Sequence, residues 1–379
     1  MTIDLSLAEH QQELQRAARD FFAEQCPASA VRDLESDPAG FEPGLWRQMA
    51  VRGWLGLTFP AGLGGGGGTF LDLLPLYEEM GRFLVPSPHL DTVVVAGDVV
   101  LQAGTDEQRR ALVPEIAAGR CIVSLAATGE GGAFGPAGLG LRAARRGGDY
   151  VLDGTALLVA FAPSADRLLC AARTSGSPRE ARGVTLLLVE NGTAGVSWNR
   201  LPNIAGAPLY EVSFEGAVVP AEQVVGQPDE GWAALSAAAT KGAVLQTASI
   251  IGAARAVLEM TNRYAQERVQ FGTPIGRNQA VQYLVTDILI DLHGIDLLTR
   301  QAAYRIDAGL PYGREATMAI VQGKKAAAHL HRQAHEVHAG IGFMAHHDLN
   351  LYSRRSKFWE NNLGDARYYQ EQLARELRL

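Results

Sequence analysis

The segment that is best suited to bind a ligand is Arg268-Val-Gln-Phe-Gly-Thr-Pro-Ile-Gly276, which is followed by Gln279. It comes directly after a long Ala-rich run that is typical of a helix, and its Pro-Ile-Gly sequence favours a turn. The segment therefore places a guanidinium and an aromatic ring at one helix end. Such a pair suits a ligand that carries both a phosphate and a ring. An ordinary helix–turn–helix joint with a surface arginine is the alternative interpretation.

Histidines form a second group of residues that could do chemistry. Several lie between His329 and His347, and His331 and His335 have the i, i+4 spacing that can bind a metal. No nearby cysteine or pair of carboxylates completes a metal signature, so no metal is expected. A structural role or a contact to an anionic ligand is favoured. The patterns of nucleophile elbows, kinases and dinucleotide-binding loops are not found.

Composition argues against several classes of function. The 379 residues carry a net charge of -7, so no basic face for nucleic acid is expected. Three widely spaced cysteines, Cys26, Cys121 and Cys170, predict no disulfide framework and are typical of a reducing cytoplasm. No apolar run reaches the roughly 18 residues of a membrane-spanning helix, so no span is expected.

The pattern of apolar residues divides the chain into three parts. Residues 1–120 predict an α-helical domain, and residues 121–228 predict a β domain because short apolar or alternating runs are separated by Gly and Asp turns. Residues 229–379 again predict a helical domain. Its last three helices are expected at Gln279–Ala308, Ala316–His338 and about Asp348–Leu379.

Several motifs follow one another in a recognisable order. They include Gly53-Trp-Leu-Gly-Leu-Thr-Phe-Pro60, Gly104-Thr-Asp-Glu-Gln108, the Arg268 segment and Val337-His-Ala-Gly-Ile-Gly-Phe343. Together they resemble the acyl-CoA dehydrogenase family over nearly the whole chain. The resemblance implies an α+β fold with an N-terminal helical domain, a middle β-barrel domain and a C-terminal four-helix bundle.

The resemblance also implies a chemistry and a cofactor. In this family a carboxylate removes the α-proton of an acyl thioester, and FAD takes a hydride from the β-carbon. The flavin lies between two subunits, one of which supplies a β-domain pocket and the other an Arg…Phe-Gly joint with a glycine turn. The positions here that match this cofactor-binding pattern are Arg268, Phe271, Gly272, Gln279, Gly340 and Thr128, with Glu336 where a glutamine is usual.

The β-domain half departs from the pattern. The serine position of the family's T-E-P-x-x-G-S-D loop falls on Phe134, and its W-x-T sequence falls on Leu158-Val-Ala160. The resemblance therefore implies that aromatic stacking and a hydroxyl hydrogen bond to the flavin are lost. This subunit would hold FAD mostly through its Arg268 face, unless other contacts replace the missing ones.

The residues at the expected positions of the catalytic base also differ from the family's pattern. The usual glutamate position falls on Leu363, and the position that a minority of members use falls on Gly242. Asp365 and Glu360 are weak substitutes. Glu360 lies nearly one helical turn before position 363, whereas Asp365, in a Gly-Asp turn, is more typical of a helix cap.

Three functions remain open at this point. The chain is a flavoenzyme that desaturates an acyl-CoA or acyl-carrier thioester, the base-lacking or structural subunit of a heteromeric enzyme, or a flavin oxidase or monooxygenase of the same fold. The second resembles the α2β2 steroid side-chain acyl-CoA dehydrogenases of actinobacteria, in which a second subunit supplies the base. An electron-transfer flavoprotein or a similar acceptor is the expected electron partner.

Overall fold

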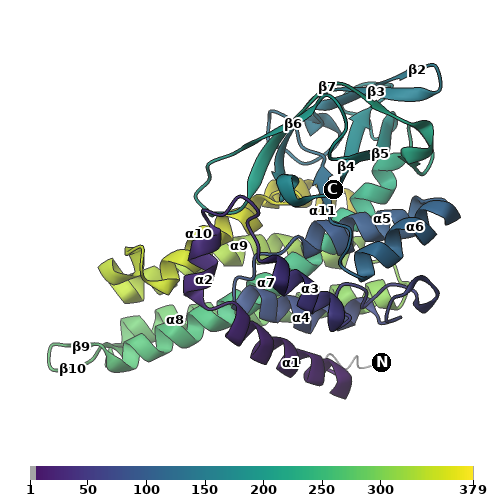
Figure 1. Cartoon of the computed structure of the whole chain (residues 1–379). Helices are drawn as coiled ribbons and strands as arrows, with labels where there is room; N and C mark the ends of the chain where they lie inside the picture. Colours follow the sequence, from purple (N-terminus) through teal and green to yellow (C-terminus); the bar gives the residue numbers. More distant parts are fainter. Residues whose placement is uncertain (1–5, 379) are drawn as a thin grey trace.

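The computed structural model describes residues 6–378, so residues 1–5 of the expected first domain and Leu379 lie outside the described residues. Helices come first, a sheet follows, and a second set of helices ends the chain, in the order that the sequence predicts (Figure 1). The first set comprises α1 (Glu9–Gln25), α2 (Ala28–Leu34), α3 (Pro43–Val51), α4 (Phe70–Arg82), the π-helical η2 (Leu90–Ala96), α5 (Gly97–Ala103) and α6 (Asp106–Ala117).

The middle part is one mixed sheet of eight strands. They are β1 (Val123–Ala126), β2 (Leu141–Arg146), β3 (Asp149–Ala160), β4 (Arg167–Arg173), β5 (Val184–Glu190), β6 (Val196–Arg200), β7 (Leu209–Val219) and β8 (Val224–Val225). The order is β6-β7-β3-β2-β4-β5-β8, and β1 pairs with β4 in parallel. The register between β3 and β7 shifts between Ala156 and Val159, which makes a bulge at Leu158. Bulges redirect side chains and are frequent beside functional sites.

The last part contains α7 (Gly231–Glu267), α8 (Gln279–Asp307), α9 (Gly313–His338), α10 (Asp348–Asn361) and α11 (Ala366–Glu376). In the described part of the chain, α7 is the one helix long and apolar enough to cross a membrane, and 72% of that stretch is buried inside the protein. It packs against α4 very closely, because a Cβ at Gly252 would lie only 1.6 Å from the carbonyl oxygen of Glu78. The α7 helix is therefore the central element of the core.

One prediction about the helices is wrong. The sequence suggests a single helix from about Asp348 to Leu379, but the structure divides this segment into α10 and α11. Leu363 and Gly364 between them have left-handed backbone conformations, with φ of 54° and 101°, which end a right-handed helix. Asp365 then begins α11, because its Oδ1 accepts a hydrogen bond from the backbone N–H of Tyr368 at 2.7 Å.

Candidate functional site

The Arg268 segment forms a hairpin that projects from the end of α7. Its strands, β9 (Val269–Gln270) and β10 (Thr273–Pro274), pair antiparallel. Phe271 and Gly272 make the turn with φ of 54° and 81°, and a two-residue hairpin turn of type I′ needs positive φ at both positions. Figure 1 shows the hairpin at the far end of α7 and α8, well away from the sheet.

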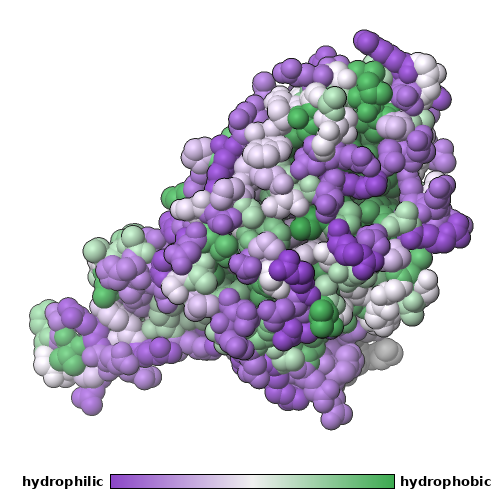
Figure 2. Space-filling model, in the orientation of Figure 1, coloured by the Kyte–Doolittle hydropathy of each residue, from purple (hydrophilic) through white to green (hydrophobic). Residues whose placement is uncertain are grey.

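The hairpin presents unpaired groups to the outside. The Phe271 ring is fully exposed and Val269 is half exposed, so Figure 2 shows a small hydrophobic patch at this tip. Arg268 is exposed, and within residues 6–378 no carboxylate pairs with its guanidinium. A bulky residue rarely adopts positive φ, and such strain collects at ligand sites. The tip therefore has a free cation and a free ring for a ligand or chain outside this subunit.

The glycine turn lies next to the base of this hairpin. His338, the last residue of α9, stacks on Tyr264 near the end of α7 with 4.6 Å between ring centroids. Gly340 follows in an exposed turn, and a Cβ at that position would meet no atom within 4 Å. This chain alone therefore does not require glycine there, whereas a ligand that approaches the backbone closely would. Glu336 and Gln279 are also exposed on this side.

The histidines of α9 pack as structural side chains. His335 stacks on Phe343 with 4.3 Å between centroids, and His331 Nδ1 contacts the carbonyl oxygen of Ala327. Burial lowers the pKa of His335 and of His338. In the described part of the chain, no three metal-ligating side chains come together.

The β-domain half of the pattern borders a very small cavity of about 30 Å³. One water molecule occupies about 30 Å³ in the liquid, so the space has no room for a flavin ring or an acyl chain as it stands. Leu158 and Leu363 both line this cavity, and both have positive φ. The lining residues are Asp91, Leu125, Ala127, Thr128, Gly132, Phe134, Leu158, Asn361, Asn362 and Leu363.

Phe134 closes this cavity on one side. Its ring lies 5.5 Å from the ring of Trp232 on α7 and 5.5 Å from that of Tyr368 on α11, measured between centroids. Aromatic contacts of this kind stabilise a structure beyond the area that they bury. The residue at the family's serine position therefore ties the loop after β1 to the helices, and it offers no hydroxyl to a ligand.

The two expected base positions meet at one point, and neither holds a carboxylate. A Cβ at Gly242 would lie 2.9 Å from Cδ1 of Leu363 and 3.3 Å from Cγ2 of Val95. The weak substitutes are engaged elsewhere. Asp365 caps α11 as described, and Glu360 accepts hydrogen bonds from Lys357 Nζ at 2.9 and 3.1 Å.

Two buried charged residues at this site escaped the sequence analysis. Asp91 is 9% exposed and lines the small cavity, and burial raises the pKa of its carboxyl to about 7. Lys324 of α9 donates hydrogen bonds to the carbonyl oxygens of Trp359 at 2.8 Å and Asn362 at 3.0 Å, and so holds the end of α10. A lone acid inside the apolar run Leu90-Asp-Thr-Val-Val-Val was the available signal for Asp91.

The residues fit FAD on one side and not on the other. The hairpin and the glycine turn offer a cation, a ring and open backbone, whereas the β-domain side is nearly filled by the chain's own side chains. The two sides also lie far apart within one chain (Figure 1). A single subunit therefore does not assemble a complete flavin site from its own two halves.

Comparison with known proteins identifies the family. Residues 8–120 match "Acyl-CoA dehydrogenase, N-terminal domain", and residues 229–377 match "Acyl-CoA dehydrogenase, C-terminal domain". The acyl-CoA dehydrogenase FadE27 of Mycobacterium tuberculosis is 31% identical over 93% of this chain and 92% of its own length. The acryloyl-CoA reductase (NADH) of Anaerotignum propionicum is 28% identical over 99% and 96%.

Solved structures of similar proteins have the same fold. A chain of the ChsE4-ChsE5 complex from Mycobacterium tuberculosis superposes with a TM-score of 0.89 at 29% identity, and the match covers 99% of each chain. A chain of a variant of the Tcur3481-Tcur3483 steroid ACAD gives a TM-score of 0.87 at 27% identity over 98% of this chain and 99% of that one. The predicted fold class is confirmed. The chain belongs to the acyl-CoA dehydrogenase family, whose members are FAD-dependent oxidoreductases that act on the CH–CH bond of acyl-CoA thioesters.

Proposed function

We propose that this chain is the base-lacking subunit of a heteromeric acyl-CoA dehydrogenase. The observation that carries the proposal is the contact between the two base positions, Gly242 and Leu363. Removal of an α-proton from a thioester requires a general base within hydrogen-bond reach. An aliphatic side chain and a glycine cannot accept that proton, so the partner subunit supplies the base in its own site.

The part that this chain plays in catalysis is to complete the partner's cofactor site. FAD, when bound, supplies the acceptor for the hydride that leaves the β-carbon. Arg268 would hold the pyrophosphate through a charge-assisted contact, and Phe271 would stack on the cofactor. Gly340 would let the backbone approach it. Thr128 remains from the β-domain half, which Phe134 and Leu158 otherwise fill.

The similar proteins support the heteromeric part of the proposal by analogy. The ChsE4-ChsE5 structure is described as a complex, and the Tcur3481-Tcur3483 structure is described as a steroid ACAD. An acyl-CoA of a bulky carboxylic acid is the substrate class that fits this analogy. A 27% identical relative is named as a subunit of the caffeyl-CoA reductase-Etf complex, which supports an electron-transfer flavoprotein as the acceptor here.

A second candidate is a self-sufficient dehydrogenase whose base is Asp91. That residue is the one carboxylate among those that line the small cavity, and a pKa near 7 suits a general base at neutral pH. The narrow cavity and the Phe134 contacts count against it, because a thioester would have to displace both. The Asp91→Asn variant separates the two candidates.

The test compares the chain alone with the chain co-expressed with a family member that keeps the glutamate, such as one encoded beside it. Dye reduction is measured with a panel of acyl-CoA thioesters. The isolated chain should show no turnover near the usual range of about 1–1,000 per second, whereas the complex should reach it. Replacing that glutamate of the partner by glutamine should abolish activity, and Asp91→Asn in this chain should leave it unchanged.

Turnover by the isolated chain at such rates would overturn the proposal. If Asp91→Asn then removed that turnover, the second candidate would be correct. Circular dichroism of the Asp91→Asn variant confirms that any loss is not a loss of folding.

A further inference from the structure

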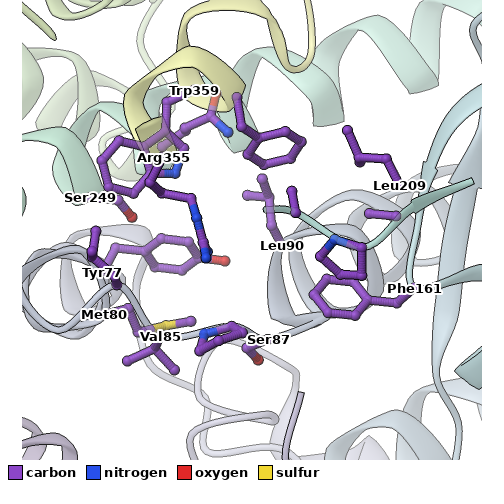
Figure 3. Close-up of a pocket in the computed structure, with 17 residues that line it drawn as sticks. Tyr77, Met80, Val85, Ser87, Leu90, Phe161, Leu209, Ser249, Arg355 and Trp359 are labelled. Carbon is purple, nitrogen blue, oxygen red and sulfur yellow. The ribbon is translucent and has the colours of Figure 1, made fainter. Parts of the chain in front are cut away.

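A second cavity, of about 80 Å³, lies between the sheet and the helices and shares no lining residue with the Leu363 cavity. Residues of α4, α7 and α10 form one side, and Phe161 and Leu209 of the β part form the other (Figure 3). Most of its lining residues are apolar. The proposed function assigns no role to any residue that lines this second cavity, so the ligand of the cavity is inferred from these residues alone.

A buried arginine without a partner enters this cavity. Arg355 of α10 is 7% exposed, and its Nε is buried without a hydrogen-bond partner. Within residues 6–378, no carboxylate pairs with it, although the adjacent Arg354 binds Glu35 at 2.8 and 3.0 Å. Figure 3 shows the Arg355 side chain running from α10 into the space beside Tyr77.

The guanidinium remains charged in this position. Burial lowers the pKa of Arg355 to about 10, which still leaves it protonated at neutral pH. A buried charge without a counter-ion is strongly unfavourable, and proteins normally neutralise it with a partner. The nearby Glu35 carboxylate raises the pKa of Arg355 but makes no hydrogen bond with it, because its hydrogen bonds go to Arg354. The missing hydrogen-bond partner of the Arg355 guanidinium is therefore the feature that needs an explanation.

A second polar group in the same cavity is also without a partner. Gln246 of α7 is 3% exposed, and its Oε1 is buried with no hydrogen bond. Buried amides are nearly always hydrogen-bonded in folded proteins. Two helices thus bring a cation and an amide to one space, and none of the 17 lining residues is acidic.

We propose that this cavity binds the carboxylate of a small organic acid, with Arg355 as its charge partner and Gln246 as a hydrogen-bond partner. The planar guanidinium matches a carboxylate in two parallel hydrogen bonds. The Gln246 amide donates to the carboxylate through its nitrogen, and its oxygen accepts a hydrogen bond from a water molecule, because a carboxylate has no proton to donate.

The size of the cavity limits the acid. About 80 Å³ is more than twice the liquid volume of one water and about half of a cavity that holds benzene. A carboxylate with a short alkyl body, such as propionate, fits this space, and Leu90 and Phe161 provide apolar contacts for the alkyl part. The same carboxylate could be the far end of a longer molecule, such as an acyl-CoA with a terminal carboxyl group.

The test measures binding to the full-length chain in the assembly in which it purifies. Propionate is titrated by calorimetry and by thermal unfolding at constant ionic strength, beside neutral propionamide and inorganic phosphate. Because a ligand of the folded state raises Tm with its concentration, propionate should raise Tm and the other two should not. Glutaryl-CoA tests the terminal carboxylate of a thioester.

Three variants assign the effect to Arg355. Arg355→Met should weaken propionate binding about ten- to hundred-fold, as expected for a charged hydrogen bond. It should unfold at the same temperature as the parent or higher in carboxylate-free buffer, because the buried charge is gone. Arg355→Lys keeps the charge without the planar fork and should bind with intermediate affinity. Lys357→Met, an exposed position on the same helix with the same charge change, should respond like the parent.

An equal response of Arg355→Met and the parent would overturn the proposal, as would equal binding of propionamide or phosphate. Binding of glutaryl-CoA without binding of propionate would support it, provided that Arg355→Met loses that binding. In that case the carboxylate belongs to a bound acyl group and not to a free acid.

Discussion

A Cβ atom at Gly242 on α7 would lie 2.9 Å from Cδ1 of Leu363, which lies in the turn between α10 and α11. The two positions that the sequence predicts for the catalytic base therefore border the same volume. In this chain the leucine side chain fills that volume, and glycine opposite leaves room for it. The pair packs together at the place where the resemblance to the family predicts a proton acceptor.

The first prediction tests this packing by a double-mutant cycle. Gly242→Ala should destabilise the chain by about 1–3 kcal/mol, because the added methyl overpacks against Leu363. Leu363→Ala should cost about 2–5 kcal/mol, because it leaves a cavity. In the Leu363→Ala background, Gly242→Ala should become neutral or stabilising by up to about 1 kcal/mol, because alanine favours a helix. Chemical unfolding of the four proteins gives the coupling energy.

Gly294→Ala on α8 is the matched control. A Cβ there would meet no atom within 4 Å, so the substitution should have the same small effect in both backgrounds. Additive effects of Gly242→Ala and Leu363→Ala would contradict the contact.

The second prediction concerns Lys324 and pH. Burial lowers the pKa of this ammonium from 10.5 to about 7 in the folded chain. Between these values the unfolded chain binds more protons than the folded chain, so stability rises as pH rises. Lys324→Met should remove this part of the pH dependence, at most about 1.4 kcal/mol per pH unit. Unfolding free energies at pH values of about 7.5 and 9.5, inside this window, provide the measurement.

The comparison with the parent isolates Lys324 from other titrating groups. Burial raises the pKa of Cys26 and Cys121 from 9.0 to about 12, so these thiols lower stability as pH rises above 9, but they do so equally in the parent and in Lys324→Met. If the parent and Lys324→Met showed the same slope of stability against pH, Lys324 would not be the group responsible.

The fold could be predicted well because its signals are local and repeated. Turn residues separate the apolar strands of residues 121–228, and helical spacing dominates on both sides. The break between α10 and α11 was missed because it depends on two left-handed residues, and one of them is Leu363. Leucine rarely adopts positive φ, so Leu363 itself gives no sign of a helix end, and the Gly364-Asp365 turn was the available signal.

The site was harder to predict because it depends on contacts between distant segments. The resemblance located Arg268, Phe271 and Leu363, but the close approach of Gly242 to Leu363 depends on the tertiary structure and cannot be read from the sequence. Asp91 and Arg355 were missed for a related reason. A charged residue in a sequence is normally exposed, and only the packing of several elements shows that these two are buried.

The third prediction addresses Arg268. Arg268→Ala should lower the FAD content of the assembled oligomer, because a charged hydrogen bond to phosphate contributes about 1.5–3 kcal/mol. Flavin absorbance per chain after dialysis measures the change. Arg277→Ala, which is also exposed and lies in the turn that follows the hairpin, is the control and should keep the FAD content of the parent. Unchanged FAD content in Arg268→Ala would show that this contact does not exist.

The last prediction concerns the number of flavins in the assembly. Exposed apolar residues on α8, including Ile290 at 63% and Leu297 at 59%, offer a surface for subunit contacts. A flavin that needs one half-site from each of two chains gains its full binding energy only when both halves are present. In this chain the half of the proposed flavin site around Arg268 is open, and the half around Phe134 is filled by side chains.

A homotetramer of this chain would pair each open half with a filled one. A heterotetramer with a partner that has an intact β-domain pocket would instead form sites between Arg268 and that pocket, and leave the filled pockets empty. We therefore expect about two FAD per four chains in the co-expressed complex, against about four for a member with intact halves. Mass spectrometry of the native complex together with flavin absorbance gives the ratio. A homotetramer of this chain alone that retains one tightly bound FAD per chain through gel filtration would contradict both the stoichiometry and the heteromeric assembly.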